Sequence, residues 1–159
     1  MLAILILTCA GCRPSVDDLL AEAERAEKDL GEWGGEVGFR EPDGPEHQLI
    51  DDNSRGIFRM PFGVIAITGL AHLGDNHGSV YMLSRDIDGR VTASKTLTLP
   101  GWPCEVAASH AEIMLRVFRG HEAATNATAK PRCDCYSLQS PNDAALTSCP
   151  TVIPDGRFQ

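Results

Sequence analysis

Residues 63–73, GVIAITGLAHL, constrain the fold of this chain more than any other stretch. Their side chains are β-branched or apolar at consecutive positions, rather than at every second position. A strand that is apolar on both faces is typical of the middle of a sheet. The sequence therefore predicts a central strand here, with neighbouring strands to pair with it.

Three nearby segments predict those neighbours. Residues 79–86, SVYMLSRD, indicate a second strand, and the dipeptide Asp-Gly at positions 88–89 is typical of a hairpin turn. Residues 90–99, RVTASKTLTL, alternate between apolar and hydroxyl-bearing side chains. Residues 56–60, GIFRM, are a candidate additional strand. Together these segments predict an antiparallel meander.

The region that follows predicts a helix and then an irregular tail. Pro103 suits the first turn of a helix over residues 103–119. One face of that helix would hold Val106, His110, Ile113, Met114 and Val117. A strand over residues 111–118 is the alternative, because EIMLRVF also suits a sheet. Residues 121–159 are polar, small and rich in proline, so they predict an irregular tail that needs an additional restraint.

The negative charge of the chain is concentrated near its N-terminus. The net charge is -8, and the segment from Arg13 to Asp52 alone has 13 acidic and 4 basic residues. Within it, residues 16–30 have apolar side chains at helical spacing, with Ser15 as a suitable N-cap. The Gly-, Pro- and Glu-rich stretch after this helix predicts a linker. We therefore expect an acidic spacer over residues 12–55 and a small globular α+β domain over residues 56–159.

Composition and motifs exclude several functions. Only 6% of the residues are aromatic and the net charge is negative, which argues against nucleic acid as a partner. Beyond the first 12 residues, the sequence contains no G-x-S-x-G elbow, P-loop, C-x-x-C redox pair or EF-hand loop. We therefore expect no cofactor, and we favour a non-enzymatic role.

The first residues, MLAILILTCAGC, indicate an export address. The apolar run is about half the ~20 residues that a transmembrane helix needs, and it fits the apolar region of a signal peptide. The end of the run resembles the lipobox of bacterial lipoproteins, in which small residues precede a lipidated cysteine. Ala10 and Gly11 match the small positions, and Cys12 matches the lipid acceptor. The resemblance implies a signal peptide over residues 1–11 and a membrane anchor at the cell envelope, whereas the alternative is a buried N-terminal strand.

Arg13 follows the lipid acceptor directly. In many Gram-negative bacteria, an aspartate at this position signals retention at the inner membrane. By the same resemblance we expect sorting to the outer membrane, or a position on the periplasmic face.

Four cysteines beyond the leader predict disulfides. In an exported protein, Cys104, Cys133, Cys135 and Cys149 are expected to form two bridges. A bridge between Cys133 and Cys135 would close a strained ring, so each is expected to pair with either Cys104 or Cys149. The spacing does not decide between the two arrangements. A four-cysteine zinc site is the alternative for a cytosolic protein.

One cluster of polar residues remains a candidate site. Residues 72–78, HLGDNHG, lie where the central strand ends and a loop begins. His72, Asp75 and His77 could ligate a metal ion or transfer protons. The same sequence is also typical of a tight hairpin loop. No recognisable motif fixes the position of a third ligand beside the other two.

These observations lead to two functional hypotheses. The first is a lipid-anchored accessory or interaction module of the cell envelope, with an envelope protein as its partner. The alternative is a small metal-dependent hydrolase that uses His72, Asp75 and His77. A pocket beside residues 72–78 with another converging His or carboxylate would favour the hydrolase.

Overall fold

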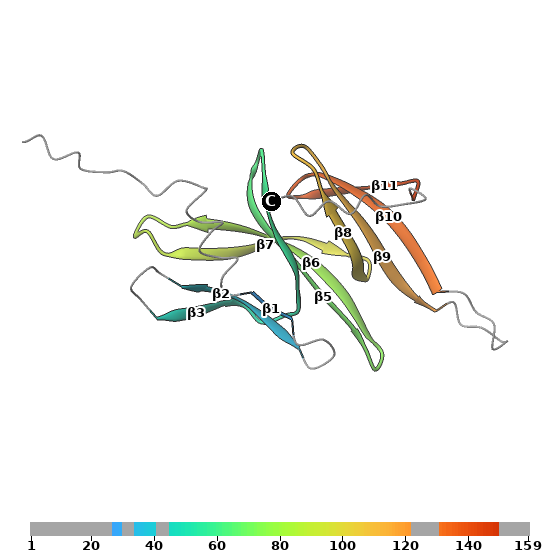
Figure 1. Ribbon diagram of the computed structural model, residues 1–159, viewed down its shortest axis with the longest axis horizontal. Helices are drawn as coiled ribbons and strands as arrows, with labels where there is room; N and C mark the ends of the chain where they lie inside the picture. The colour runs from blue at the N-terminus through green and yellow to red at the C-terminus, as the bar shows by residue number, and fades with distance from the viewer. Residues whose placement is uncertain (1–26, 30–33, 41–44, 122–130, 150–159) are drawn as a thin grey trace, which may run out of the picture.

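The computed structural model describes residues 27–29, 34–40, 45–121 and 131–149. All regular elements in these ranges are β-strands, and they form three antiparallel sheets (Figure 1). None of the described residues belongs to a helix that is long and apolar enough to cross a membrane. The expected α+β class is therefore wrong for the described part of the chain, which is all-β.

The three sheets follow one another along the chain. The N-terminal sheet has the order β1-β2-β3 and contains β1 (Glu27–Asp29), β2 (Gly35–Arg40) and β3 (Glu46–Ile50). The central sheet has the order β4-β5-β6-β7 and contains β4 (Ser54–Met60), β5 (Gly63–His72), β6 (Asp75–Arg85) and β7 (Val91–Leu99). The C-terminal sheet has the order β11-β10-β9-β8 and contains β8 (Trp102–Ala108), β9 (Ile113–His121), β10 (Pro131–Ser140) and β11 (Asp143–Thr147).

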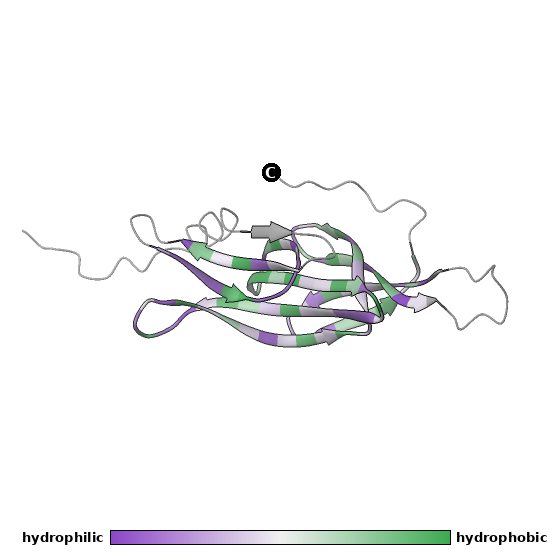
Figure 2. Cartoon of the chain, turned by 90° about the horizontal axis from the view of Figure 1, so that it is seen from below, coloured by the Kyte–Doolittle hydropathy of each residue, from purple (hydrophilic) through white to green (hydrophobic). Residues whose placement is uncertain are grey.

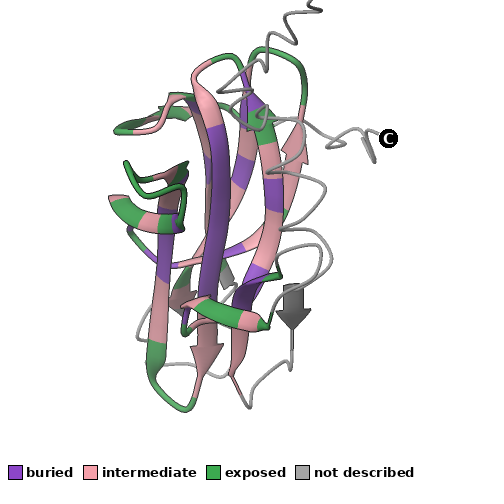
Figure 3. Ribbon diagram, turned by 90° about the vertical axis from the view of Figure 1, so that its left-hand side faces the viewer, coloured by how far each residue is buried: buried purple, intermediate pink, exposed green. Residues whose placement is uncertain are grey.

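The central sheet confirms the predicted meander. Strands β4 to β7 pair with their sequence neighbours in antiparallel register. Residues 64–69 of β5 are all buried, as expected for a strand that is covered on both faces (Figure 3). The turn predicted at positions 88–89 is also present, because Gly89 has a φ of 83° and its amide donates to the carbonyl of Asp86 at 3.1 Å.

Each face of the central sheet packs against a different neighbour. Val64 and Ala66 of β5 lie in one core with side chains of the N-terminal sheet, among them Phe39. Ile65 and Ile67 point the other way, into a second core with side chains of the C-terminal sheet. The alternation of side chains along a strand therefore divides the apolar residues of β5 between two cores. Figure 2 shows the apolar positions along the strands of this layered arrangement.

Part of the expected spacer over residues 12–55 is folded into the N-terminal sheet. Residues 35–50 of that spacer include β2 and β3, and Val37 and Ile50 are buried in the first core. The predicted helix over residues 16–30 is wrong at its end, where Glu27–Asp29 form β1. Its remainder and the expected signal peptide lie outside the described residues.

The predicted helix over residues 103–119 is also wrong. This segment forms β8 and β9, so the alternative strand over residues 111–118 was the correct one. Pro103 is tolerated because β8 is an edge strand, where a missing amide donor is acceptable. His110, expected on an apolar helix face, lies exposed in the β8–β9 turn.

The described part of the C-terminal tail, residues 131–149, forms strands rather than the irregular segment that we expected. β10 pairs with β9 and β11, and Leu138 is fully buried in the second core. A disulfide joins Cys135 on β10 to Cys149, so one of the predicted bridges is present. The tail is thus held by strand pairing and core packing in addition to sulfur.

Candidate functional site

The β5–β6 hairpin carries the residues that the sequence singled out. Its strands pair from Val64–Leu83 outward to the last pair, His72–Asp75, which leaves a turn of two residues. Leu73 and Gly74 form that turn with φ angles of 44° and 95°. Two positive φ values are typical of the type I′ turn, which matches the twist of the flanking strands.

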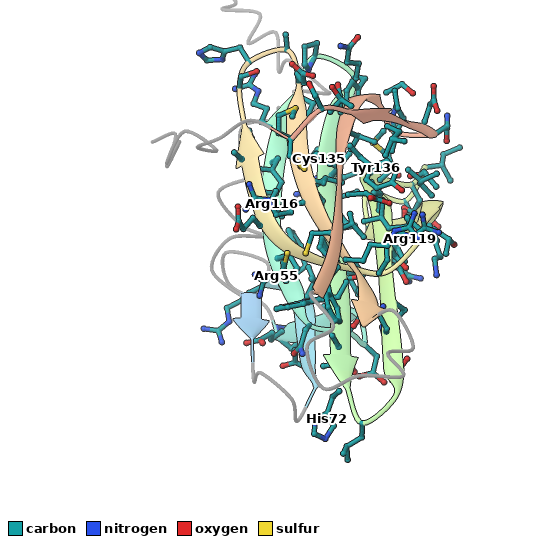
Figure 4. The ribbon with its side chains drawn as sticks, turned by 90° about the vertical axis from the view of Figure 1, so that its right-hand side faces the viewer. Arg55, His72, Arg116, Arg119, Cys135 and Tyr136 are labelled. Atoms are coloured by element: carbon teal, nitrogen blue, oxygen red, sulfur yellow. A yellow bond between two sulfur atoms is a disulfide. The ribbon has the colours of Figure 1, made fainter. Side chains whose placement is uncertain are left out.

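His72, Asp75 and His77 share one face of this hairpin. His72 is opposite Asp75, and His77 is opposite Leu70 two residues further along each strand. Since side chains alternate along a strand, all of these positions face the same way. Figure 4 shows His72 at the far end of the hairpin, away from Cys135 and Tyr136 on the C-terminal sheet.

His77 lies between two carboxylates. Its Nδ1 is 3.0 Å from Oδ1 of Asp75, and its Nε2 is 3.2 Å from Oδ1 of Asp52. Asp52 comes from the connection between β3 and β4, and its other oxygen accepts a hydrogen bond from the Thr68 hydroxyl at 2.8 Å. The side chain of Asp52 is 11% exposed and that of His77 is 39% exposed.

This environment favours the charged imidazolium. Burial lowers the pKa of His77, but the hydrogen bonds to Asp75 and Asp52 and the charges of these carboxylates raise it more, so the pKa lies above 6.5. An imidazolium donates from both ring nitrogens, which is what two carboxylate partners require. The three side chains therefore form a charged clamp between the hairpin and the β3–β4 connection.

The arrangement differs from a catalytic triad. In a triad, one histidine nitrogen faces a nucleophile and the other faces a carboxylate. Here both nitrogens of His77 face carboxylates, and the hydroxyl of Thr68 donates to Asp52. With both nitrogens engaged, His77 is poorly placed to remove a proton from a substrate.

Metal binding at this hairpin is not supported by the geometry. Across the described ranges, no group of three or more His, Cys, Asp or Glu side chains is placed to hold a metal ion. Asp75 and His77 are brought together as the sequence suggested, but as hydrogen-bond partners of each other.

Sequence reasoning missed Asp52 and Thr68. Asp52 lies 25 positions before His77 and contributes only through the tertiary fold. Thr68 did carry a signal, because a hydroxyl at a fully buried position of an apolar strand needs a hydrogen-bond partner. That signal indicates that a partner exists and does not identify it.

Two turn residues expose large apolar side chains. Leu73 at the β5–β6 turn is 93% exposed, and Ile87 at the β6–β7 turn is 97% exposed. The two turns lie at opposite ends of the central sheet (Figure 1). Leu73 also has the positive φ that asparagine or glycine adopts with less strain.

The hairpin is anchored to the C-terminal sheet by closely packed glycines. Gly69 and Gly78 are opposite each other in β5 and β6. A Cβ atom on Gly69 would lie 2.7 Å from Cδ of Pro103, and one on Gly78 would lie 2.8 Å from the same atom. Gly78 would also come within 2.5 Å of the carbonyl oxygen of Gly101. Only glycine therefore fits where the hairpin crosses the start of β8.

Comparisons with protein-family models, with curated proteins and with solved structures give no match for this chain.

Proposed function

We propose that this protein is a lipid-anchored interaction module of the cell envelope that binds a partner protein through the β5–β6 hairpin and has no catalytic role. The proposal rests on the exposure and the backbone conformation of Leu73. A leucine held at a φ of 44° is unfavourable for turn formation, and its side chain is 93% exposed at the tip of the hairpin. Such local conflicts are typical of functional positions.

The hairpin around Leu73 is suited to contact a partner protein through its tip. The hairpin is stiff, because its base is held by the glycine contacts with Pro103 and by the clamp of His77 between Asp52 and Asp75. A rigid element loses little conformational entropy when it binds. An exposed apolar tip with polar side chains beside it also resembles the centre and rim of a small protein interface.

The lipid anchor is supported by the lipobox-like sequence that ends at Cys12. Expressed in a bacterium that processes lipoproteins, the protein should partition into the detergent phase. Cys12→Ser should release it into the aqueous phase or block removal of the leader. An exported protein that retains Met1 would contradict the lipoprotein part of the proposal.

The binding part can be tested by photo-cross-linking in the envelope. A photoreactive side chain at position 73 should give a discrete cross-linked product, and the same group at position 87 is the matched control because Ile87 is equally exposed. A competing copy of the protein without the probe should suppress the product, and a competing Leu73→Asn variant should not. Equal cross-linking at both positions would contradict the proposal.

A further inference from the structure

The outer face of the C-terminal sheet brings together two further cysteines. Cys104 lies on edge strand β8 and Cys133 lies on β10, with β9 between them. Both thiols are free and half-buried. Along β9 the two positions are nearly level, because Cys133 is opposite Phe118 and the residues that flank Cys104 are opposite Val117 and Arg116.

Strands two places apart in a flat sheet are about 9.5 Å apart, which is too far for their cysteines to meet. This sheet is irregular at both positions. The β8–β9 register shifts between Pro103 and Glu105, at Cys104 itself, and the β9–β10 register shifts between Pro131 and Cys133. Bulges increase the local twist of a strand and redirect its side chains. The two irregularities lie at Cys104 and next to Cys133, where they can turn each thiol toward the other across β9.

The two thiols lie close enough over β9 for Cys133 to be among the neighbours that raise the pKa of the Cys104 thiol. The sulfur of Cys104 also donates to the carbonyl oxygen of Arg116 at 3.2 Å, directly over β9.

Arg55 holds the bulge at Cys104 in place. Its guanidinium donates to the carbonyl oxygens of Pro103 and Cys104, each at 3.1 Å, and lies 5.2 Å from the centre of the Trp102 ring. These carbonyls belong to the irregular part of β8. The arginine comes from β4 in the central sheet, so the position of Cys104 is fixed by tertiary contacts as well as by its own strand. Figure 4 shows Arg55 and Arg116 on this side of the molecule.

We propose that Cys104 and Cys133 are an oxidation site at which a disulfide-donating partner forms a second bridge, which links β8 to β10 across β9. The site is separate from the β5–β6 hairpin and does not depend on its proposed function. With Cys135 already joined to Cys149, this bridge is also the only pairing left for the four cysteines of the described part of the chain.

The reaction is two successive thiol–disulfide exchanges. The Cys133 thiol loses its proton to solvent and attacks one sulfur of an external disulfide, which forms a mixed disulfide and releases one thiolate. Cys104 then loses its proton to solvent and attacks the sulfur of Cys133, which releases the second thiolate. The two released thiolates take up the two protons. The protein is oxidised by two electrons, and the external disulfide is reduced to two thiols.

The order of attack follows from the environment of Cys104. Burial first, and then the neighbouring Cys133 and Glu105, raise the pKa of the Cys104 thiol. Attack requires a thiolate, so the raised pKa disfavours Cys104 as the first nucleophile. Cys133 therefore reacts first and Cys104 closes the bridge.

The test uses the chain with Cys9 and Cys12 replaced by serine, with Cys135–Cys149 intact and oxidised glutathione as the disulfide donor. Oxidation should remove the mass of two hydrogen atoms and join the peptides that contain Cys104 and Cys133. The Cys104→Ser variant should stop at a mixed disulfide of glutathione with Cys133. The Cys133→Ser variant should in turn stop at a mixed disulfide of glutathione with Cys104.

The oxidised protein should unfold at a temperature about 5–10 °C higher than protein with both thiols free, because the bridge closes a long loop. An intermolecular dimer, a bridge between Cys133 and Cys149, or two glutathione adducts without ring closure would each overturn the proposal. Since the peptide map of the chain that retains Cys104 and Cys133 alone gives these outcomes, the test does not depend on the folding of the Cys104→Ser or Cys133→Ser variant.

Discussion

At the scale of single residues, His77 determines how the protein responds to pH. Its pKa is raised above 6.5 because Asp75 and Asp52 outweigh the effect of burial. A group whose pKa is raised on folding stabilises the folded state while it is protonated. This stabilisation is complete below a pH of about 6.5 and is lost as the pH rises through the raised pKa.

We therefore predict that His77→Gln is most destabilising at acidic pH. The wild-type protein should be the more stable of the two at pH 6, by less than about 1 kcal/mol because the side chain is 39% exposed and screened by solvent. The difference should shrink as the pH rises through the raised pKa. Urea unfolding of both proteins between pH 5.5 and 9 measures it, and a difference that grows with pH would contradict the clamp.

Leu73 is the residue at which stability and function are expected to conflict. Asparagine adopts the positive φ of a type I′ turn more readily than leucine. Leu73→Asn should therefore raise the free energy of unfolding by up to about 1 kcal/mol and fail to compete for the cross-linked product. Leu73→Ala is the control, because it removes the apolar side chain and retains the unfavourable φ. A loss of stability in Leu73→Asn would show that the leucine has a structural role.

At the scale of elements, the crossing of the β5–β6 hairpin over β8 depends on the absence of side chains. Gly78→Ala would place a Cβ atom 2.8 Å from Cδ of Pro103 and 2.5 Å from a backbone oxygen. Backbone cannot move aside as cheaply as a flexible side chain, so we expect a loss of about 1–3 kcal/mol. Ser94→Ala, at an exposed position of β7, should change stability by less than about 0.5 kcal/mol. Equal effects in thermal unfolding would argue against the close crossing.

The elements also show where sequence reasoning succeeds. β5 could be predicted because a run that is apolar on both faces has few alternatives. The strands of residues 103–119 could not be predicted, because the apolar residues there fit two periods. Val106, Ile113 and Val117 recur at helical spacing, whereas Ile113, Leu115 and Val117 alternate as in a strand. The burial of Leu115 in the second core follows strand alternation, so tertiary packing decided the structure there.

The candidate site was predictable to the same partial extent. Asp75 and His77 are close in sequence and meet in the hairpin, so their pairing could be anticipated. The contribution of Asp52 could not be anticipated, because Asp52 contacts His77 only through the tertiary fold. The β-strands of residues 35–50 were hidden by glycines, prolines and charges, which are typical of linkers.

At the scale of the whole molecule, the central sheet is stable because both its faces are covered. One cover comes from the acidic N-terminal part of the chain and the other from the cysteine-bearing C-terminal part. A strand such as β5 that lost either cover would expose a row of large apolar side chains. The three sheets are therefore expected to unfold as one unit.

Phe39 provides a test of the N-terminal cover. It is 2% exposed in the first core, and Phe39→Ala should lower the free energy of unfolding by about 3–5 kcal/mol. His47 is opposite Phe39 in the next strand and is exposed, so His47→Ala should have little effect and serves as the control. A small effect of Phe39→Ala in chemical denaturation would mean that residues 35–50 are a spacer after all.

Residue-resolved hydrogen exchange of the full chain tests the layered fold most directly. The buried amides of β2, β5 and β10 should exchange with the same free energy of opening, because all three strands contribute to the two shared cores. Reduction of Cys135–Cys149 should lower this value for all three strands together. If β2 or β10 instead exchanged at the rate of an unstructured chain while β5 stayed protected, the central claim that three sheets form one folded unit would be contradicted.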